Sequence, residues 1–252
     1  MGSIGLKIVA NAPADGYTLG LIAMPYVVAP SLIARMPFDI ARDLAPIAML
    51  NWSYTLLAVR STAAVRSVPE LIASAQVEAG TMKYSSGGNG TPPHLAGALF
   101  AREAGIDILH VPYKGSPAGV AALVGGEVDM AFGPIAALSP HLESGKLRAI
   151  ATAAPARLRG YPEIPTLKEL GYAAAEVSDW QGIVGPIGTP REVIEQLHAQ
   201  IAKILATPEM RERLNAIGME SSDLGPRAFA AHLRTEIKRW NDLVRTMGIK
   251  AD

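Results

Sequence analysis

The sequence predicts an α/β fold made of two domains joined by extended segments. The first observation is that short apolar runs alternate with helical patterns between about residues 83 and 152. Such alternation favours a mostly parallel sheet with helices on both faces. The second observation is a pair of strand-like crossings, near residues 58 and 184, at which the chain can pass from one domain to the other. We therefore expect domain 1 to comprise residues 1–60 and 185–252, and domain 2 residues 61–184.

Composition limits the classes of function. The chain has 252 residues, 49% of them hydrophobic, and a net charge of zero. The length suffices for two modest cores, and the absence of a basic field argues against nucleic acid as a partner. There is no cysteine, so disulfides and thiolate metal sites are excluded. No apolar run is long enough for a transmembrane helix, and Met1–Lys7 does not have the pattern of a signal peptide.

The chain before residue 83 is expected to supply the first part of domain 1 and the entry into domain 2. Ser67 followed by Glu70 has the spacing of a capping box, which predicts that a helix starts there. The other elements follow from apolar runs, β-branching and turn residues. They are the end of a helix over 6–12, a strand over 17–23, a short helix over 29–34, and strands over 46–50 and 54–59.

The rest of the chain is expected to complete both domains. In the middle segment we expect strands at 83–85, 108–111, 130–132 and 148–152, with helices at 93–104, 116–125, 135–144 and 166–170. A strand over 177–185 contains Trp180 and forms the second crossing. Helices are expected at 191–206, 209–217 and 227–247, and their apolar stripes are typical of core-facing helices.

The glycine-rich stretch after the strand at 83–85 is the first candidate site. Gly87, Gly88 and Gly90 allow unusual backbone angles and a close ligand approach, and Thr91 followed by Pro92 is typical of a helix start. A strand–turn–helix of this kind is expected to direct free amides and a helix dipole at an anion. Neither GxxxxGK[ST] nor GxGxxG is present, so a carboxylate is expected before a nucleotide phosphate. The alternative is a turn that binds nothing.

Several ordered motifs carry a family resemblance along the chain. They are Ala14–Leu19, Ser86–Gly97, His110–Gly115, Leu123–Asp129, Gly145–Ile150, Pro162–Thr166, Ser178–Gly182 and the helix start near Thr189-Pro190. Together they resemble the Bug family, the solute receptors of tripartite tricarboxylate transporters. The resemblance implies a type II periplasmic-binding-protein architecture with a strand hinge. It also implies a periplasmic location, a small carboxylate ligand held in an interdomain cleft, membrane permease subunits as partners, and no cofactor. The family's N-terminal strand, Gly-rich loop and helix are not found, which indicates an N-terminally truncated receptor with a free sheet edge and possible self-association.

Ligands of parallel sheets bind beyond the carboxyl ends of the strands, and this rule selects the candidate residues. Lys114 can add charge to the cleft, although a surface lysine is the ordinary alternative. His94 can donate to a bound oxygen, or it can be a backbone-bonded histidine at a helix start. The ligand-binding set is Ser85, Ser86, Gly87, Gly88, Asn89, Gly90, Thr91, His94, Lys114, Gly133 and Pro134, with Met24 and Pro25 from domain 1 and Asp179 from the second crossing.

Asp179 bears on the class of ligand. In the resemblance its segment faces the cleft, where a carboxylate would repel a second carboxylate and would pair with an ammonium or a hydroxyl. We therefore expect amino-acid-like or hydroxylated ligands to be preferred over plain dicarboxylates. The alternative is an exposed or hinge-capping aspartate.

Other functions receive less support from the residues. An enzyme would use Ser86 with His94, but no nucleophile motif surrounds them. An effector-sensing regulator would need a DNA-binding helix-turn-helix, for which no segment is left. A receptor-like relative that has lost ligand binding and acts as a regulatory or partner-binding protein stays open. The five histidines have no metal-ligand spacing, so no metal site is expected.

Overall fold

The computed structural model describes residues 3–33 and 36–247. The chain forms two compact units, unit 1 (Met1–Trp52 and Asp179–Asp252) and unit 2 (Ser53–Ser178). The chain passes between them inside strand β2 (Leu44–Arg60) and again at the first residue of β7 (Ser178–Pro186). The domain boundaries expected at residues 60 and 184 lie further along the chain than these two points.

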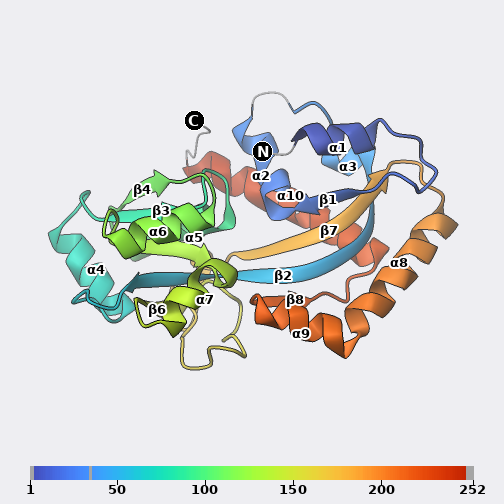
Figure 1. Ribbon diagram of the computed structural model, residues 1–252. Coiled ribbons are helices and arrows are strands. Elements are labelled where there is room, and N and C mark those ends of the chain that lie inside the picture. The colour runs from blue at the N-terminus through green and yellow to red at the C-terminus, as the bar shows by residue number, and fades with distance from the viewer. Residues whose placement is uncertain (1–2, 34–35, 248–252) are drawn as a thin grey trace. The chain divides into compact units, whose positions relative to one another are not determined.

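The sheet of unit 2 contains four strands that run in the same direction. Strand β3 (Lys83–Ser86) pairs in parallel with β4 (Leu109–Pro112) and β5 (Met130–Pro134). The C-terminal half of β2 runs antiparallel between β5 and β6 (Leu147–Thr152). The carboxyl ends of β3, β4, β5 and β6 therefore lie at one edge of the sheet (Figure 1). This is the edge at which α/β sheets bind ligands.

Helices cover both faces of this sheet. Successive side chains of β3 point to opposite faces, and each face is packed against a different helix. On the Tyr84 face lies α5 (Pro92–Ala104), where a Cβ added at Gly97 would be 2.3 Å from the Tyr84 ring. On the Ser85 face lies α6 (Ser116–Gly125), and the Ser85 hydroxyl donates to the Gly119 carbonyl at 2.8 Å. The remaining helices of unit 2 are α4 (Val68–Val77), α7 (Ile135–Glu143) and the single turn η1 (Ala173–Ala175).

Unit 1 surrounds the N-terminal half of β2. Strand β1 (Gly20–Ala23) pairs antiparallel with β7, and both β7 and the short β8 (Met219–Ser221) are hydrogen-bonded to β2. Its core contains Trp180 and Trp240, whose indole N–H groups both donate to the buried Glu236 carboxylate. The helices are α1 (Ser3–Ala10), α2 (Met24–Leu32), α3 (Ile40–Asp43), α8 (Arg191–Ala206), α9 (Pro208–Ala216) and α10 (Pro226–Met247), of which α10 packs on α2 (Figure 1).

The α/β class and the strand–helix alternation of the middle segment are confirmed, and one predicted helix is wrong. Residues 166–170 form turns instead of a helix. Thr166 and Glu169 do make the reciprocal bonds of a capping box, with the Thr166 amide donating to Glu169 at 2.9 Å and the Glu169 amide to the Thr166 hydroxyl at 3.0 Å. Gly171 then adopts a positive φ of 96°, which ends the helical turn as soon as it has begun.

Two other differences concern strands and short elements. The runs expected at 46–50 and 54–59 form one strand, because the polar residues Asn51 and Ser53 are buried within it instead of forming a loop. The elements α3, η1 and β8 were not predicted. Each has three or four residues, too few for a periodic pattern. The short helix expected over 29–34 is α2, which begins earlier, at Met24, and ends at Leu32; Ala34 lies outside the described part of the chain.

We predict that Gly97→Ala destabilises the protein while Gly125→Ala does not. The new methyl group at position 97 would meet the Tyr84 ring inside a packed core, which costs about 1–3 kcal/mol. At Gly125, near the end of α6, nothing lies within 4 Å, so alanine adds helix propensity worth up to about 1 kcal/mol. Chemical denaturation of both variants measures the difference. A Gly97→Ala variant as stable as the wild type would contradict the tight packing of α5 on β3.

Candidate functional site

The glycine-rich loop between β3 and α5 occupies the carboxyl edge of the unit 2 sheet. Gly88 and Gly90 have φ angles of 124° and 72°, which other residues rarely adopt. Gly87 is required for a different reason, since a Cβ there would lie 2.8 Å from the Ser116 hydroxyl and 2.9 Å from its amide. The loop therefore follows a path that only glycine allows at these three positions.

Hydrogen bonds within the loop use amides that we expected to be free. The Gly88 amide donates to the Ser86 hydroxyl at 3.1 Å, and the Gly90 amide donates to His94 Nδ1 at 3.0 Å. The Thr91 amide donates to the Gly88 carbonyl at 3.3 Å. The expectation of free amides is therefore wrong for these three groups. The loop is held in shape from inside, and a ligand has fewer bare N–H groups than the sequence suggests.

The start of α5 also differs from the expected pattern. Thr91 is the N-cap residue, but its hydroxyl makes no capping bond and donates instead to the Gly88 carbonyl at 2.6 Å. The next two residues, Pro92 and Pro93, have no amide hydrogen. His94 takes over part of the cap, since its ring nitrogen accepts from Gly90 one turn earlier. The start of α5 still carries the positive end of the helix dipole, but it offers few N–H groups that could donate to an anion.

Two histidines are stacked behind the loop. The rings of His94 on α5 and His110 on β4 lie 4.0 Å apart with an interplanar angle of 11°. His110 Nε2 is 2.7 Å from the Ser86 hydroxyl, and the centroid of the His110 ring is 4.8 Å from that of the Tyr84 ring. Burial, followed by repulsion from His94, lowers the pKa of His110 to about 3. A neutral His110 therefore joins β3, β4 and α5 at the base of the loop.

Ser86 pairs with His110 and not with His94, the partner that the sequence suggests. The parallel register Ser86↔Pro112 places His110 two residues before the partner of Ser86, on the same face of the sheet. In the described chain no acidic side chain is bonded to His110, and Ser86 is 1% exposed. The pair therefore has the geometry of a structural contact, with neither an exposed nucleophile nor an oriented base.

A second loop lies directly against the first. The Tyr113 amide donates to the Ser86 carbonyl and the Gly115 amide to the Gly87 carbonyl, each at 3.2 Å. Lys114, between them, is exposed. Gly133 and Pro134 end the neighbouring strand β5, so the structure brings the unit 2 candidates from three strand ends to one edge.

The three remaining candidates belong to unit 1. Met24 is fully buried at the start of α2, and the adjacent Pro25 is partly buried. Asp179 is partly buried at the start of β7, where its carboxylate accepts the Trp180 amide at 2.9 Å. Burial raises the pKa of Asp179 to about 6, and the Trp180 amide opposes this shift in part. A carboxyl group with this pKa changes charge just below neutral pH.

Within residues 3–33 and 36–247, no group of three histidine or acidic side chains is arranged to hold a metal ion. In the same ranges no helix combines the length and the apolar composition needed to span a membrane.

The fold is that of solved periplasmic binding proteins, which defines the class of the protein as a solute-binding receptor. The family model described as "Tripartite tricarboxylate transporter family receptor" matches residues 1–249. The chain therefore belongs to this receptor family, and the resemblance to Bug proteins is confirmed.

Relatives and solved structures agree with this assignment. A UPF0065 protein of Pseudomonas sp. strain P51 is 34% identical over 96% of this chain and 73% of its own length. The protein BugT of Bordetella pertussis is 32% identical over 99% of this chain and 77% of its own. The structure of R. palustris Rpa4515 with adipate has a TM-score of 0.88 at 32% identity, covering 98% of this chain and 83% of that one. MatC from Rhodopseudomonas palustris with bound malate has a TM-score of 0.83 at 28% identity, covering 96% and 84%.

We predict that His110 remains neutral well below the ordinary histidine pKa. The folded protein disfavours its protonation, so the stability contributed by the neutral, stacked ring is lost as the pH falls from about 6.5 toward 3. Nitrogen-15 NMR of the imidazole rings should show neutral shifts for His110 at pH 5. A midpoint near 6.5 would contradict the buried stack.

We predict that Asp179→Asn stabilises the protein at neutral pH. The raised pKa means that the folded state favours the protonated carboxyl, so wild-type stability falls as the pH rises from about 4 through about 6. The amide keeps an oxygen for the Trp180 N–H and never acquires charge. Denaturation at pH 7.5 should show a gain of about 2 kcal/mol, which should vanish near pH 4. An equal gain at both pH values would contradict a titrating Asp179.

Proposed function

We propose that this receptor captures a small carboxylate in the periplasm and delivers it to the membrane subunits of a tripartite transporter. The observation that carries the proposal is the convergence of two loops, Gly87–Thr91 and Tyr113–Gly115, at the carboxyl edge of a parallel sheet. The family assignment supports the receptor role. The similarity to proteins that hold adipate and malate supports a carboxylate ligand.

In the proposed site, backbone amides contribute only part of the ligand contacts. With the amides of Gly88, Gly90 and Thr91 bonded inside the loop, the ligand relies more on the Lys114 ammonium, the positive end of α5 and ordered water. Water-mediated contacts tolerate ligands with different tails. The candidate residues of unit 2 stay proposed as ligand contacts beside the loop, and Asp179, Met24 and Pro25 stay proposed as contacts within unit 1.

Asp179 selects among carboxylates in this proposal. When it is charged, it repels the second carboxylate of a plain dicarboxylate and favours a ligand that carries an ammonium or a hydroxyl group. Because its pKa is raised to about 6, this preference should weaken as the pH falls below that value.

A second function is favoured by the use of the loop amides. A loop whose amides at 88, 90 and 91 are satisfied internally needs no ligand to be stable. Such a loop would suit a receptor-like protein that has lost ligand binding and serves as a regulatory or partner-binding relative. The two functions differ in whether any carboxylate binds.

A thermal-shift screen with succinate, malate, adipate, citrate and aspartate separates them. A ligand of the folded state at 100 times its Kd adds about 2.7 kcal/mol, which raises Tm by several degrees. We expect aspartate or malate to raise Tm more than succinate does, and Asp179→Ala to reduce that preference. Lys114→Met should weaken binding, whereas Lys146→Met, at an exposed lysine at the other end of the sheet, should not.

The contrary results are equally clear. No shift with any acid would contradict the carboxylate receptor and would favour the second function. Equal relative affinities in the wild type and in Asp179→Ala would contradict the selecting role of Asp179.

A further inference from the structure

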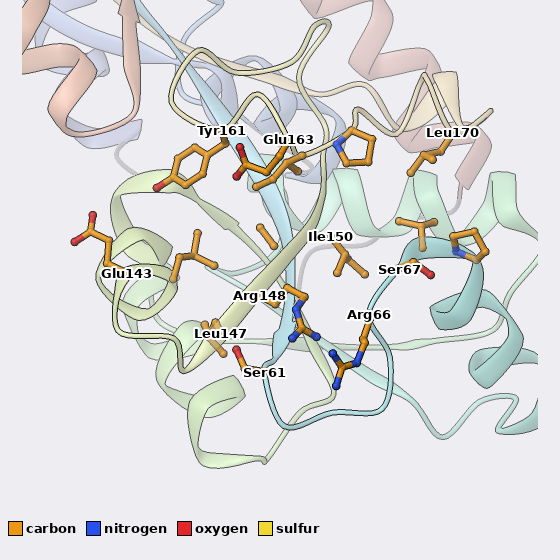
Figure 2. Close-up of a pocket in the computed structure, with 16 residues that line it drawn as sticks. Ser61, Arg66, Ser67, Glu143, Leu147, Arg148, Ile150, Tyr161, Glu163 and Leu170 are labelled. Atoms are coloured by element: carbon orange, nitrogen blue, oxygen red, sulfur yellow. The ribbon is translucent and has the colours of Figure 1, made fainter.

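An open cavity of about 600 Å³ lies in unit 2, and none of the proposed carboxylate-site residues lines it (Figure 2). It is formed where the start of α4, the end of α7 and the first residues of β6 meet the loop over 161–170. Its volume is within the range of small-molecule sites. The charged groups in its lining are Arg66, Arg148, Glu143 and Glu163.

One end of the cavity carries two guanidinium groups. In Figure 2, Arg66 and Arg148 lie at the lower end, beside Ser61. Nη1 of Arg148 is buried and has no hydrogen-bond partner in the described chain. A guanidinium stays charged at every accessible pH, so a buried N–H without an acceptor is costly. The described residues also provide no salt bridge to either arginine, although the Glu70 carboxylate accepts the Arg66 backbone amide.

Arg60, on the strand that pairs with β6, is an arginine whose charge is satisfied by the fold. Arg60, the last residue of β2, donates from Nη1 to the carbonyls of Val128 at 2.9 Å and Leu123 at 3.4 Å. Its charge is thereby bound to the end of α6. Arg148, on the neighbouring strand β6, has no such acceptor for Nη1 within residues 3–33 and 36–247. An anion entering the cavity would supply it in the two-point geometry that guanidinium groups favour.

The other end of the cavity is acidic, and its middle is apolar. Figure 2 shows Tyr161 and Glu163 at the upper end, with the Tyr161 hydroxyl directed toward the side on which Glu143 lies. Burial, and then the negative charges of Glu143 and Glu163, raise the pKa of Tyr161, so both carboxylates act on the same end of the cavity. Ile150 lies between the two ends in the figure, and the remaining apolar lining includes Val68, Leu142, Leu147 and Ile164.

We propose that this cavity is a second ligand site, for a small zwitterion whose anionic and cationic groups are separated by an apolar chain. The anionic group binds Arg148 and Arg66, and the cationic group lies toward Glu163 and Glu143. The chain packs on the apolar middle, where burial supplies affinity. The site is independent of the carboxylate proposed for the glycine-rich loop, and it lies at the amino end of β6, whereas that loop lies at the carboxyl ends of the parallel strands.

Calorimetric titration with 6-aminohexanoate tests the proposal, with hexanoate and hexylamine as probes that carry one charge each. We expect 6-aminohexanoate to bind more tightly than either. Arg148→Met should weaken it about 10-fold or more, because a charge-assisted pair is lost. Glu163→Gln, at an exposed position, should reduce the preference for 6-aminohexanoate over hexanoate about 3-fold. Arg102→Met, an exposed arginine of α5 outside the cavity, is the matched control and should leave binding unchanged.

Each contrary result overturns a stated part of the proposal. Absence of binding to the wild type, or binding that Arg148→Met leaves intact, would overturn the site. Hexanoate binding as tightly as 6-aminohexanoate would overturn the zwitterion assignment. If Arg148→Met does not fold, Arg148→Lys keeps the charge and loses the fork geometry, and the same weakening is expected. Lys114→Met should leave this titration unchanged, so failure here and failure of the carboxylate receptor are distinguishable.

Discussion

The parallel pairing of β3 with β4 is the constraint on which the candidate site depends. Its register places Tyr84, Ser86 and His110 on one face of the sheet, against α5. His94 then stacks on His110, and its other contact, with Gly90, shapes the loop. A shift of β4 by one residue would turn His110 to the α6 face and away from Ser86 and His94. The loop conformation is therefore a consequence of strand register as much as of its glycines.

A loop built in this way is preorganised, and preorganisation has a cost and a benefit. The amides bonded to Ser86, His94 and Gly88 are unavailable to a ligand. In exchange, the loop does not have to be ordered when a ligand arrives, which removes an entropic penalty from binding. This balance explains how one geometry is compatible with a receptor and with a relative that no longer binds. The exposed Lys114 beside the loop favours the receptor.

The arginines of unit 2 differ in whether the fold supplies hydrogen-bond acceptors for their N–H groups. Arg60 is bonded to the end of α6 and serves the fold. Arg148 lies on β6, which β2 and β5 separate from β3. Its Nη1 is buried and has no acceptor among the described residues. The sequence does not show which arginine has acceptors and which does not, because both lie in β-strands beside apolar residues. It depends on which carbonyls the tertiary structure brings within reach.

The sequence by itself determined the α/β class, the order of the main strands and helices, the glycine-rich turn and the receptor family. These follow from local periodicity, turn chemistry and ordered motifs, which are all readable along the chain. Only the tertiary structure decided the partner of Ser86, the partners of the loop amides and the burial of Arg148 Nη1 without an acceptor among the described residues. Those facts depend on contacts between residues far apart in sequence, and local patterns carry no information about which distant atom will satisfy a hydrogen bond.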